Sequence, residues 1–242
     1  DHGRCFSDQH DANAGDIAER IAACTHVISA PGEVTDEGLA VAYYVRGYSY
    51  DRIGELARAV ADYTQSVAYN PKFAEPYSMR ALTRMHMGQL DDALRDANLA
   101  VAADPKSYSA YTTRVTINMA REDYAQARDD TNYIIQNFPQ SATDQYYQLA
   151  EIYLQLGDMD RALAAAETSV KVAPNYLQSY EERARILFAM QHYKDVVPDA
   201  SVLIRVAPRS AEGYFLRSFS RAMLLDFGPA LADVDAGVAL AP

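Results

Sequence analysis

Long apolar runs and the short motifs of nucleotide-binding and hydrolytic enzymes are both missing from this chain of 242 residues. No apolar stretch approaches the roughly 18 residues that a membrane-spanning helix needs, which predicts that no segment crosses a membrane. No G-x-x-x-x-G-K-S/T, G-x-G-x-x-G or G-x-S-x-G pattern occurs, so neither a phosphate-binding loop nor a nucleophile elbow is visible. We therefore expect a protein that is not an enzyme and uses no cofactor.

Basic residues are scarce: 22 lysines and arginines stand against 33 aspartates and glutamates, which gives a net charge of −11. Nucleic-acid binding needs basic stripes, so the charge balance argues against nucleic acid and against docking on an anionic membrane. The apolar fraction of 49 % and the charged fraction of 23 % are typical of a soluble folded protein.

Cysteine is rare as well, with Cys5 and Cys24 both in the first tenth of the chain. We predict that they form a disulfide, because they share one short segment that has little core of its own. Closing a loop of this length stabilises the fold by roughly 3 kcal/mol on the chain-entropy model. A disulfide would imply an oxidising compartment, whereas the alternative is two reduced thiols in a cytosolic protein.

Five histidines occur, and two of them, His2 and His10, form one short cluster in the sequence with Cys5 and Asp8. Their spacing matches no established zinc pattern, so we predict no metal site.

The chain does contain an internal repeat. Six copies of one pattern occupy residues 40–71, 74–105, 108–139, 143–174, 177–208 and 211–242. Each copy closes on a proline, and the successive prolines are 34, 34, 35, 34 and 34 residues apart. Such a period predicts stacked helix pairs. The closing proline ends the second helix of a pair, because its ring and missing N–H prevent continuation.

Fixed positions within the copies carry a family resemblance. Positions 8 and 20 are small in most copies, as in Gly47 and Ala59, which lets the two helices of a pair approach closely. The pattern resembles the tetratricopeptide repeat (TPR) and covers about 85 % of the chain. The resemblance implies an all-α fold, a right-handed α-α superhelix (solenoid) of six TPR helix pairs. Position 4 is always tyrosine: Tyr43, Tyr77, Tyr111, Tyr146, Tyr180 and Tyr214.

The residues before the repeats divide into two parts. Residues 1–12 are polar and without periodicity, so we expect a coil. Residues 14–29 carry Ile17, Ile21, Cys24 and Ile28 at helical spacing and resemble the second helix of a TPR pair. We expect this helix to cap the first repeat. The predicted organisation is an N-terminal coil and capping helix over 1–37, followed by the six-repeat array over 38–242.

Position 7, normally apolar in a TPR, is arginine in five copies, and position 23 is aspartate in the same five. The fourth copy has Leu149 and Ala165 instead. Because a partly buried arginine is costly without a carboxylate, we predict that the two side chains pair within each repeat. An arginine ladder for anionic ligands is the less favoured alternative. The predicted pairs are Arg46 with Asp62, Arg80 with Asp96, Arg114 with Asp130, Arg183 with Asp199 and Arg217 with Asp233.

Two features of the last repeats depart from the pattern. Pro198 lies near the fourth or fifth residue of a second helix and is expected to shorten its first turn or kink it. Leu231, Val234 and Val238 form an apolar stripe on the final helix. We expect further residues to cover this stripe, another chain to meet it, or the stripe to stay exposed.

The resemblance also implies a concave groove that the first helix of each repeat lines through positions 2, 5, 9, 12 and 13. These positions hold aromatic residues, methionine and acids, which suit adaptable contacts with a basic or neutral peptide. Each of these residues could instead pack against the next helix. The candidate ligand-binding residues are Tyr44, Tyr48, Leu82, His86, Tyr147, Glu151, Arg185, Phe215 and Phe219.

These features favour a non-enzymatic protein–protein interaction module that binds a peptide or protein segment in the groove. The alternative is a structural subunit of a larger complex, or self-association through the sixth repeat as a homo-oligomer. The cysteine pair, the segment IAACTHVI and the repeat type resemble TPR proteins exported to the bacterial periplasm, which implies a periplasmic or exported location. A cytoplasmic location is the alternative. Because the chain starts at Asp1 and shows no signal peptide, we expect a processed chain or part of a longer one.

Overall fold

The computed structural model describes residues 2–6, 14–30, 32, 34–141 and 143–240. Helices carry the regular structure of these ranges, and none of them is long and apolar enough to cross a membrane. The chain forms two compact units, residues 1–123 and 124–242, and the division falls between the two helices of the third repeat. The predicted all-α class is confirmed.

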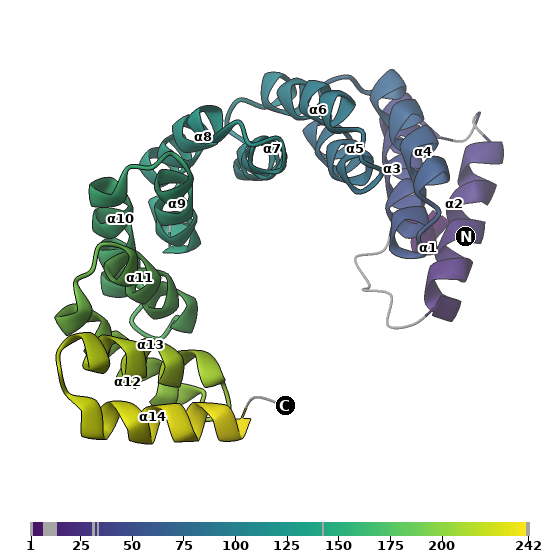
Figure 1. Ribbon diagram of the computed structural model, residues 1–242. Helices are drawn as coiled ribbons and strands as arrows, with labels where there is room; N and C mark the ends of the chain where they lie inside the picture. Colours follow the sequence, from purple (N-terminus) through teal and green to yellow (C-terminus); the bar gives the residue numbers. More distant parts are fainter. Residues whose placement is uncertain (1, 7–13, 31, 33, 142, 241–242) are drawn as a thin grey trace. The chain divides into compact units, whose positions relative to one another are not determined.

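The first unit is built from consecutive helix pairs. Helix α3 packs against α4, and α5 packs against α6, as Figure 1 shows. Helix α2 packs along α3, the position expected of a capping helix. The helices of this unit are α1 (His2–Cys5), α2 (Ala14–Ser29), α3 (Asp36–Arg52), α4 (Leu56–Tyr69), α5 (Ala74–His86), α6 (Leu90–Ala103) and α7 (Tyr108–Ala120).

The predicted coil over residues 1–12 is wrong at its start, because His2–Cys5 forms the short helix α1. A disulfide between Cys5 and Cys24 joins this turn to α2. Both cysteines are fully buried in a cluster with Ala23, Val27 and Ala42, so the cross-link fixes α1 against the cap and the first repeat. Residues 7–12 of the expected coil lie outside the described residues.

The second unit repeats the same arrangement. Three helix pairs pack in sequence, α9 with α10, α11 with α12 and α13 with α14, and α8 packs on α9. The predicted sequential pairing is therefore confirmed. The helices are α8 (Tyr124–Asn137), α9 (Thr143–Gln155), α10 (Met159–Val172), α11 (Leu177–Ala189), α12 (Tyr193–Val206), α13 (Ala211–Met223) and α14 (Phe227–Leu240), with a short 3-10 helix at Pro139–Ser141.

The expectation for Pro198 is wrong in one respect. Helix α12 runs over 14 residues with Pro198 inside it, the same length as α10 and α14, so the proline does not shorten the helix. The missing N–H and the proline ring affect the carbonyl four residues earlier, that of Lys194. That carbonyl belongs to the first turn, and the later turns of the helix form without it.

The turn between the two helices of a repeat has one recurring backbone feature. Position 15 has a positive φ in all six repeats, between 63° and 78°. Glycine occupies it three times, as in Gly88, while Glu122, Gln191 and Leu225 adopt the same conformation despite their side chains. Because this region is unfavourable for residues with a Cβ atom, the turn holds local strain in the three repeats without glycine.

Replacing Gly88 with alanine is expected to lower the free energy of unfolding by about 1–2 kcal/mol. A Cβ atom at this position would meet nothing within 4 Å, so the loss comes from the backbone alone. Gly228 in α14 offers the matched control, since it also has free space and sits in a helix. Gly228→Ala should be neutral or stabilising by up to about 1 kcal/mol in the same urea titration. Equal effects at both positions would contradict the explanation.

The arginines of position 7 bond to the aspartates of position 23. In the second repeat, Arg80 Nε and Nη2 donate to the two carboxylate oxygens of Asp96 at 2.8 and 2.6 Å. The same two-bond geometry joins Arg46 to Asp62, Arg183 to Asp199 and Arg217 to Asp233. For Arg114 and Asp130, which belong to different units, the pairing stays a prediction.

The same arginines also connect consecutive repeats, which the sequence analysis did not foresee. The remaining nitrogen, Nη1, donates to a polar side chain at position 25 of the preceding second helix: Arg80 to Thr64 at 2.9 Å, and Arg217 to Ser201 at 3.1 Å. Arg46 reaches Thr25 of the capping helix at 3.1 Å in the equivalent way. One guanidinium therefore holds three helices together.

Tyrosine at position 4 completes this arrangement. The guanidinium carbon of Arg80 lies 5.5 Å from the ring centroid of Tyr77, one turn earlier on the same helix, and the first, third and fifth repeats have the same contact. Cation–π contact of this kind favours a charged group at a partly buried site. In the fourth repeat, Leu149 and Ala165 instead join a core cluster with Ala162 and Ile186.

Candidate protein-binding surface

The first helices of the repeats lie next to one another within each unit. Helix α5 contacts α3 and α7 in the first unit, and α11 contacts α9 and α13 in the second. These two sets of helices carry all nine candidate groove residues. Each set belongs to one unit and forms a surface of that unit.

In the first unit the candidate side chains differ in how far they are exposed to solvent. The ring of Tyr44 packs edge-on against Phe73 with centroids 5.2 Å apart, and it also lies 6.2 Å from the fully buried ring of Tyr63. Tyr44 therefore contributes to packing. Tyr48 is 38 % exposed and His86 is exposed, whereas Leu82 is half-buried.

In the second unit the candidates gather around one arginine. Arg185 Nη2 on α11 lies 2.7 Å from Glu181 on the same helix and 2.6 Å from Glu212 on α13. A third acid, Glu182, is farther away, with 4.0 Å between Oε2 and Arg185 Nη1. Burial raises the pKa of Glu181, and the adjacent Glu212 raises it further, while Arg185 opposes both.

Glu182, which lies beside these candidates, is a residue that the repeat pattern did not single out. Its side chain is 7 % exposed, and burial raises the pKa of its carboxyl; Arg185 lowers this pKa, while Glu151 and Glu181 raise it. The residue stands at position 6, which holds Val45, Met79 and Leu216 in other repeats. The signal for it in the sequence is an acid at a position that is often apolar.

Glu182→Gln is expected to stabilise the protein by about 1 kcal/mol at pH 7, because it removes a buried charge that lacks a hydrogen-bond donor among the described residues. A carboxyl whose folded pKa is raised destabilises the fold above that pKa and ceases to do so below its ordinary value. The advantage of the variant should therefore shrink as the pH falls through this window. Urea titrations of both proteins at pH 7 and pH 4 test this, and a gain that persists undiminished at pH 4 would contradict it.

Tyr147 of α9 lies beside these acids. Burial raises the pKa of its hydroxyl, and the nearby charges of Glu182, Glu151 and Glu181 raise it further. Its ring packs edge-on against Tyr176 with centroids 6.1 Å apart, which holds it in place. Tyr147 and Glu151, two of the predicted candidates, thus share one site with Arg185.

Aromatic side chains continue this surface toward the sixth repeat. Phe188 of α11 lies 5.0 Å from Phe219 of α13, and Tyr193 packs against both rings. Phe215 and Phe219 are 43 % and 50 % exposed. They also line an apolar hollow of about 580 Å³ together with Phe227, Leu231 and Val234 of α14. The predicted apolar stripe is exposed, with Leu231 at 62 % and Val238 at 59 %.

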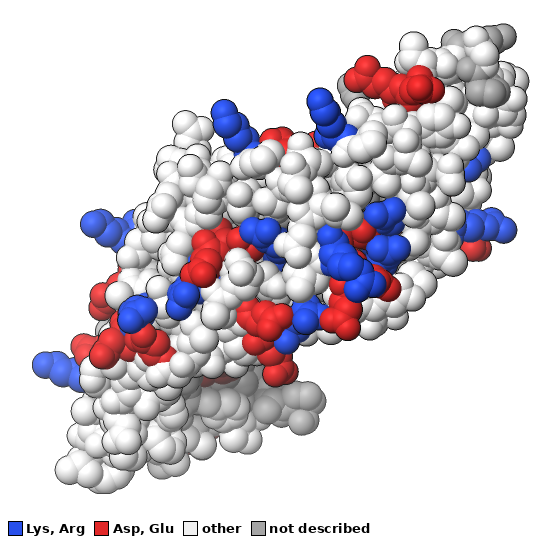
Figure 2. Space-filling view, turned by 90° about the horizontal axis from the view of Figure 1, so that it is seen from above, with Lys and Arg blue, Asp and Glu red and all other residues white. Residues whose placement is uncertain are grey.

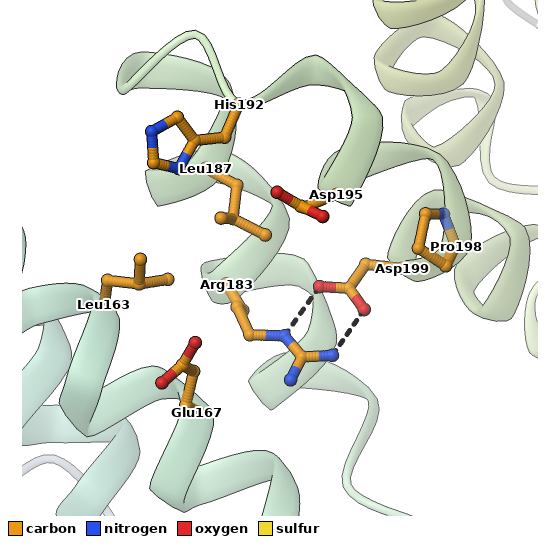
Figure 3. A pocket seen from close by; sticks show the side chains of 8 residues that line it. All are labelled: Leu163, Glu167, Arg183, Leu187, His192, Asp195, Pro198 and Asp199. Carbon is orange, nitrogen blue, oxygen red and sulfur yellow. Dashed lines mark hydrogen bonds and ion pairs between the residues drawn. The ribbon is translucent and has the colours of Figure 1, made fainter.

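A second hollow, of about 430 Å³, lies on the second-helix side of the same unit (Figure 3). It surrounds the pair of Arg183 and Asp199, and Glu167 stands where other repeats carry the acceptor for Nη1. Among the described residues Arg183 donates only to Asp199, so the link to the preceding repeat is absent here. The lining of the hollow combines exposed side chains such as Glu167 with the buried side chains of Leu187 and Asp199.

Charges of both signs are interspersed on the face drawn in Figure 2, where blue and red side chains lie next to each other. This agrees with the ion pairs of the repeats. Within the described ranges, no group of three or more histidine, cysteine, aspartate or glutamate side chains is arranged to hold a metal ion.

Comparison with protein-family models gives matches to the tetratricopeptide repeat. One model matches residues 44–107 and 78–142, and a second matches residues 145–176. Together they span more than half of the chain. No curated protein matches this sequence.

Solved structures of similar fold have low sequence identity to this chain. A tetratricopeptide repeat protein from Parabacteroides merdae has a TM-score of 0.66 at 19 % identity, over 94 % of this chain and 88 % of that one. PilF of Pseudomonas aeruginosa has a TM-score of 0.68 at 16 % identity, over 82 % and 90 %. YrrB, described as a TPR protein with an unusual peptide-binding site, has a TM-score of 0.63 at 18 % identity, over 74 % and 92 %. At these identities the likeness shows the fold.

Proposed function

Because the chain belongs to the tetratricopeptide repeat family, we propose that it is a non-enzymatic adaptor that binds a peptide or protein segment along the first helices of its repeats. The observation that carries the proposal is the surface of α9, α11 and α13. Arg185, Phe215 and Phe219 stay exposed there beside half-buried Tyr147 and Glu151. Aromatic residues and arginine are the side chains that most often anchor protein partners. YrrB, with its peptide-binding site, is a precedent in the same fold.

Site-specific photo-cross-linking during affinity capture tests which face is used. Benzoylphenylalanine placed at Ala189, an exposed position of α11, should cross-link to the captured partner in a native extract. The same residue at Ala164, exposed on the second helix α10, is the matched control and should not. Cross-linking from Ala164 alone would move the binding surface to the second helices and contradict the proposal.

Self-association through the sixth repeat is the second candidate, and the exposed apolar hollow of α13 and α14 supports it. Phe227, Leu231 and Val238 are each about 60 % exposed, and burying such a patch against a second copy is favourable. A dimer in light scattering that Leu231→Asp dissociates would favour this candidate over the adaptor. A monomer at high micromolar concentration would contradict it.

We also infer a periplasmic or otherwise exported location, since disulfides persist in oxidising compartments. The disulfide of Cys5 and Cys24 supports this inference. Blocking free thiols in living cells before purification, followed by mass measurement of the intact chain, tests it. Two alkylated cysteines would contradict the inference and favour the cytoplasm.

A further inference from the structure

The surface of α9, α11 and α13 holds more negative charge than it can pair. Three glutamates, Glu181, Glu182 and Glu212, lie within 4.0 Å of one cation, Arg185, and the charge of a fourth, Glu151, acts on Glu182. Arg185 uses Nη2 for Glu181 and Glu212, at 2.7 and 2.6 Å. Glu151 has no ion pair with any described residue, and its charge acts on both Glu182 and Tyr147. The site therefore lacks positive charge between α9 and α11.

Glu182 shows where that charge is missing. Its side chain is more than nine-tenths buried, no described residue donates a hydrogen bond to it, and Nη1 of Arg185 is 4.0 Å from its Oε2. A buried carboxylate is expensive unless a donor or an opposite charge meets it. Since its neighbours are Glu151, Glu181 and Arg185 of the groove face, a donor can reach it from that face.

The surroundings favour a long cationic side chain over a small ion. Metal binding is disfavoured because no group of acids in the described ranges converges as a metal site requires. Half-buried Tyr147 lies beside the acids, and Phe188 and Phe219 continue the same face. Lysine and arginine lay their apolar stems on such surfaces and place their charge at the end, where Glu182 and Glu151 stand.

We propose that this site binds the side chain of a lysine or arginine in the partner segment, with its charge between Glu151 and Glu182 and its stem beside Tyr147. The inference rests on the proposed function and adds to it the class of ligand. It also assigns roles to the groove residues: the glutamates select charge, Arg185 holds Glu181 and Glu212 in place, and the aromatic residues supply contact area.

Fluorescence polarisation with four pools of labelled nonapeptides tests the site on the full chain. Each pool is randomised over uncharged residues and carries one fixed central residue: lysine, arginine, norleucine or glutamate. Norleucine keeps the apolar stem of lysine without its charge. We expect the lysine and arginine pools to bind at least tenfold more tightly than the norleucine pool, and the glutamate pool to bind most weakly.

Glu182→Gln should reduce the tenfold preference for the cationic pools to about threefold or less. Glu167→Gln, an equal change of charge at an exposed residue of α10 outside the site, should leave the preference unchanged. Equal binding of the norleucine and lysine pools would overturn this inference while leaving peptide binding intact. Absence of binding by all four pools would contradict the proposed function itself.

Discussion

Replacing Asp96 with alanine is expected to lower the free energy of unfolding by about 3–5 kcal/mol, the largest loss from any single substitution considered. The carboxylate is 1 % exposed and accepts two hydrogen bonds from Arg80 and one from Arg84. Without it, the guanidinium of Arg80, 7 % exposed, stays buried with no counter-charge. Urea denaturation followed by circular dichroism measures the loss.

The fourth repeat supplies the rescue for this variant. Arg80→Leu combined with Asp96→Ala copies Leu149 and Ala165, and it should regain most of the loss because an apolar pair needs no partner. Asp92→Ala, on the same helix but with a 39 % exposed side chain, should cost less than about 1 kcal/mol. Equal free energies of unfolding for Asp96→Ala and Asp92→Ala would contradict the prediction, because the buried ion pair of Asp96 would then contribute no more to stability than an exposed one.

Breaking the disulfide of Cys5 and Cys24 is expected to lower the free energy of unfolding by about 3 kcal/mol. The bond closes a sequence separation of 19 residues. Helix α1 has four residues, too few to be stable alone, so its position depends on this bond and on the buried cluster around it. Urea midpoints measured with and without a phosphine reductant test the effect.

A double variant, Cys5→Ala with Cys24→Ala, separates the cross-link from the reagent. It should match the reduced protein in its urea midpoint and should not respond to the reductant. A wild-type midpoint that does not move after mass spectrometry has shown complete reduction would contradict the prediction. In that case the buried cluster would hold α1 without the covalent bond.

Recognition and stability are expected to oppose each other at Glu182. The same carboxylate that destabilises the isolated protein at neutral pH is the group proposed to meet a cationic partner. A ligand that satisfies it should therefore raise stability by more than its contact area alone suggests, since binding removes an existing penalty. The stabilising effect of Glu182→Gln should disappear once such a peptide is bound to the wild type.

Several features of the fold were predictable because they depend on local sequence. In the first five repeats a proline stands two residues after the end of the second helix, and small residues such as Gly47 and Ala59 mark where the two helices of a repeat meet. At Gly47 a Cβ atom would lie 3.0 Å from ring atoms of Tyr63, so the small residue is required. The partnership of arginine and aspartate was also accessible, since five repeats have both residues and the fourth has neither.

Features that depend on contacts with neighbouring repeats could not be predicted from the local sequence. In the second, third and sixth repeats a further bond joins the arginine of position 7 to position 25 of the repeat before it, and threonine, asparagine and serine serve as the acceptors. Because the acceptor varies in type, no single residue marks the contact. The prediction that Pro198 shortens its helix was wrong for a related reason. The effect of a proline depends on which turn of the helix contains the carbonyl that loses its hydrogen bond.

The opening repeat, residues 40–71, shows both kinds of feature: those set by the local sequence and those set by neighbouring helices. By itself the sequence determined the period, the helix pairs, the fold family and the residue at each repeat position, because these follow from spacing along one chain. Tertiary structure alone decided which of the candidate residues are exposed and which pack against a neighbouring helix. In the opening repeat it packs Tyr44 against Phe73 and leaves Tyr48 exposed. In the fifth repeat it leaves Glu182 without a hydrogen-bond donor among the described residues. Burial and partnership are set by side chains from adjacent helices, and spacing within one helix does not specify them.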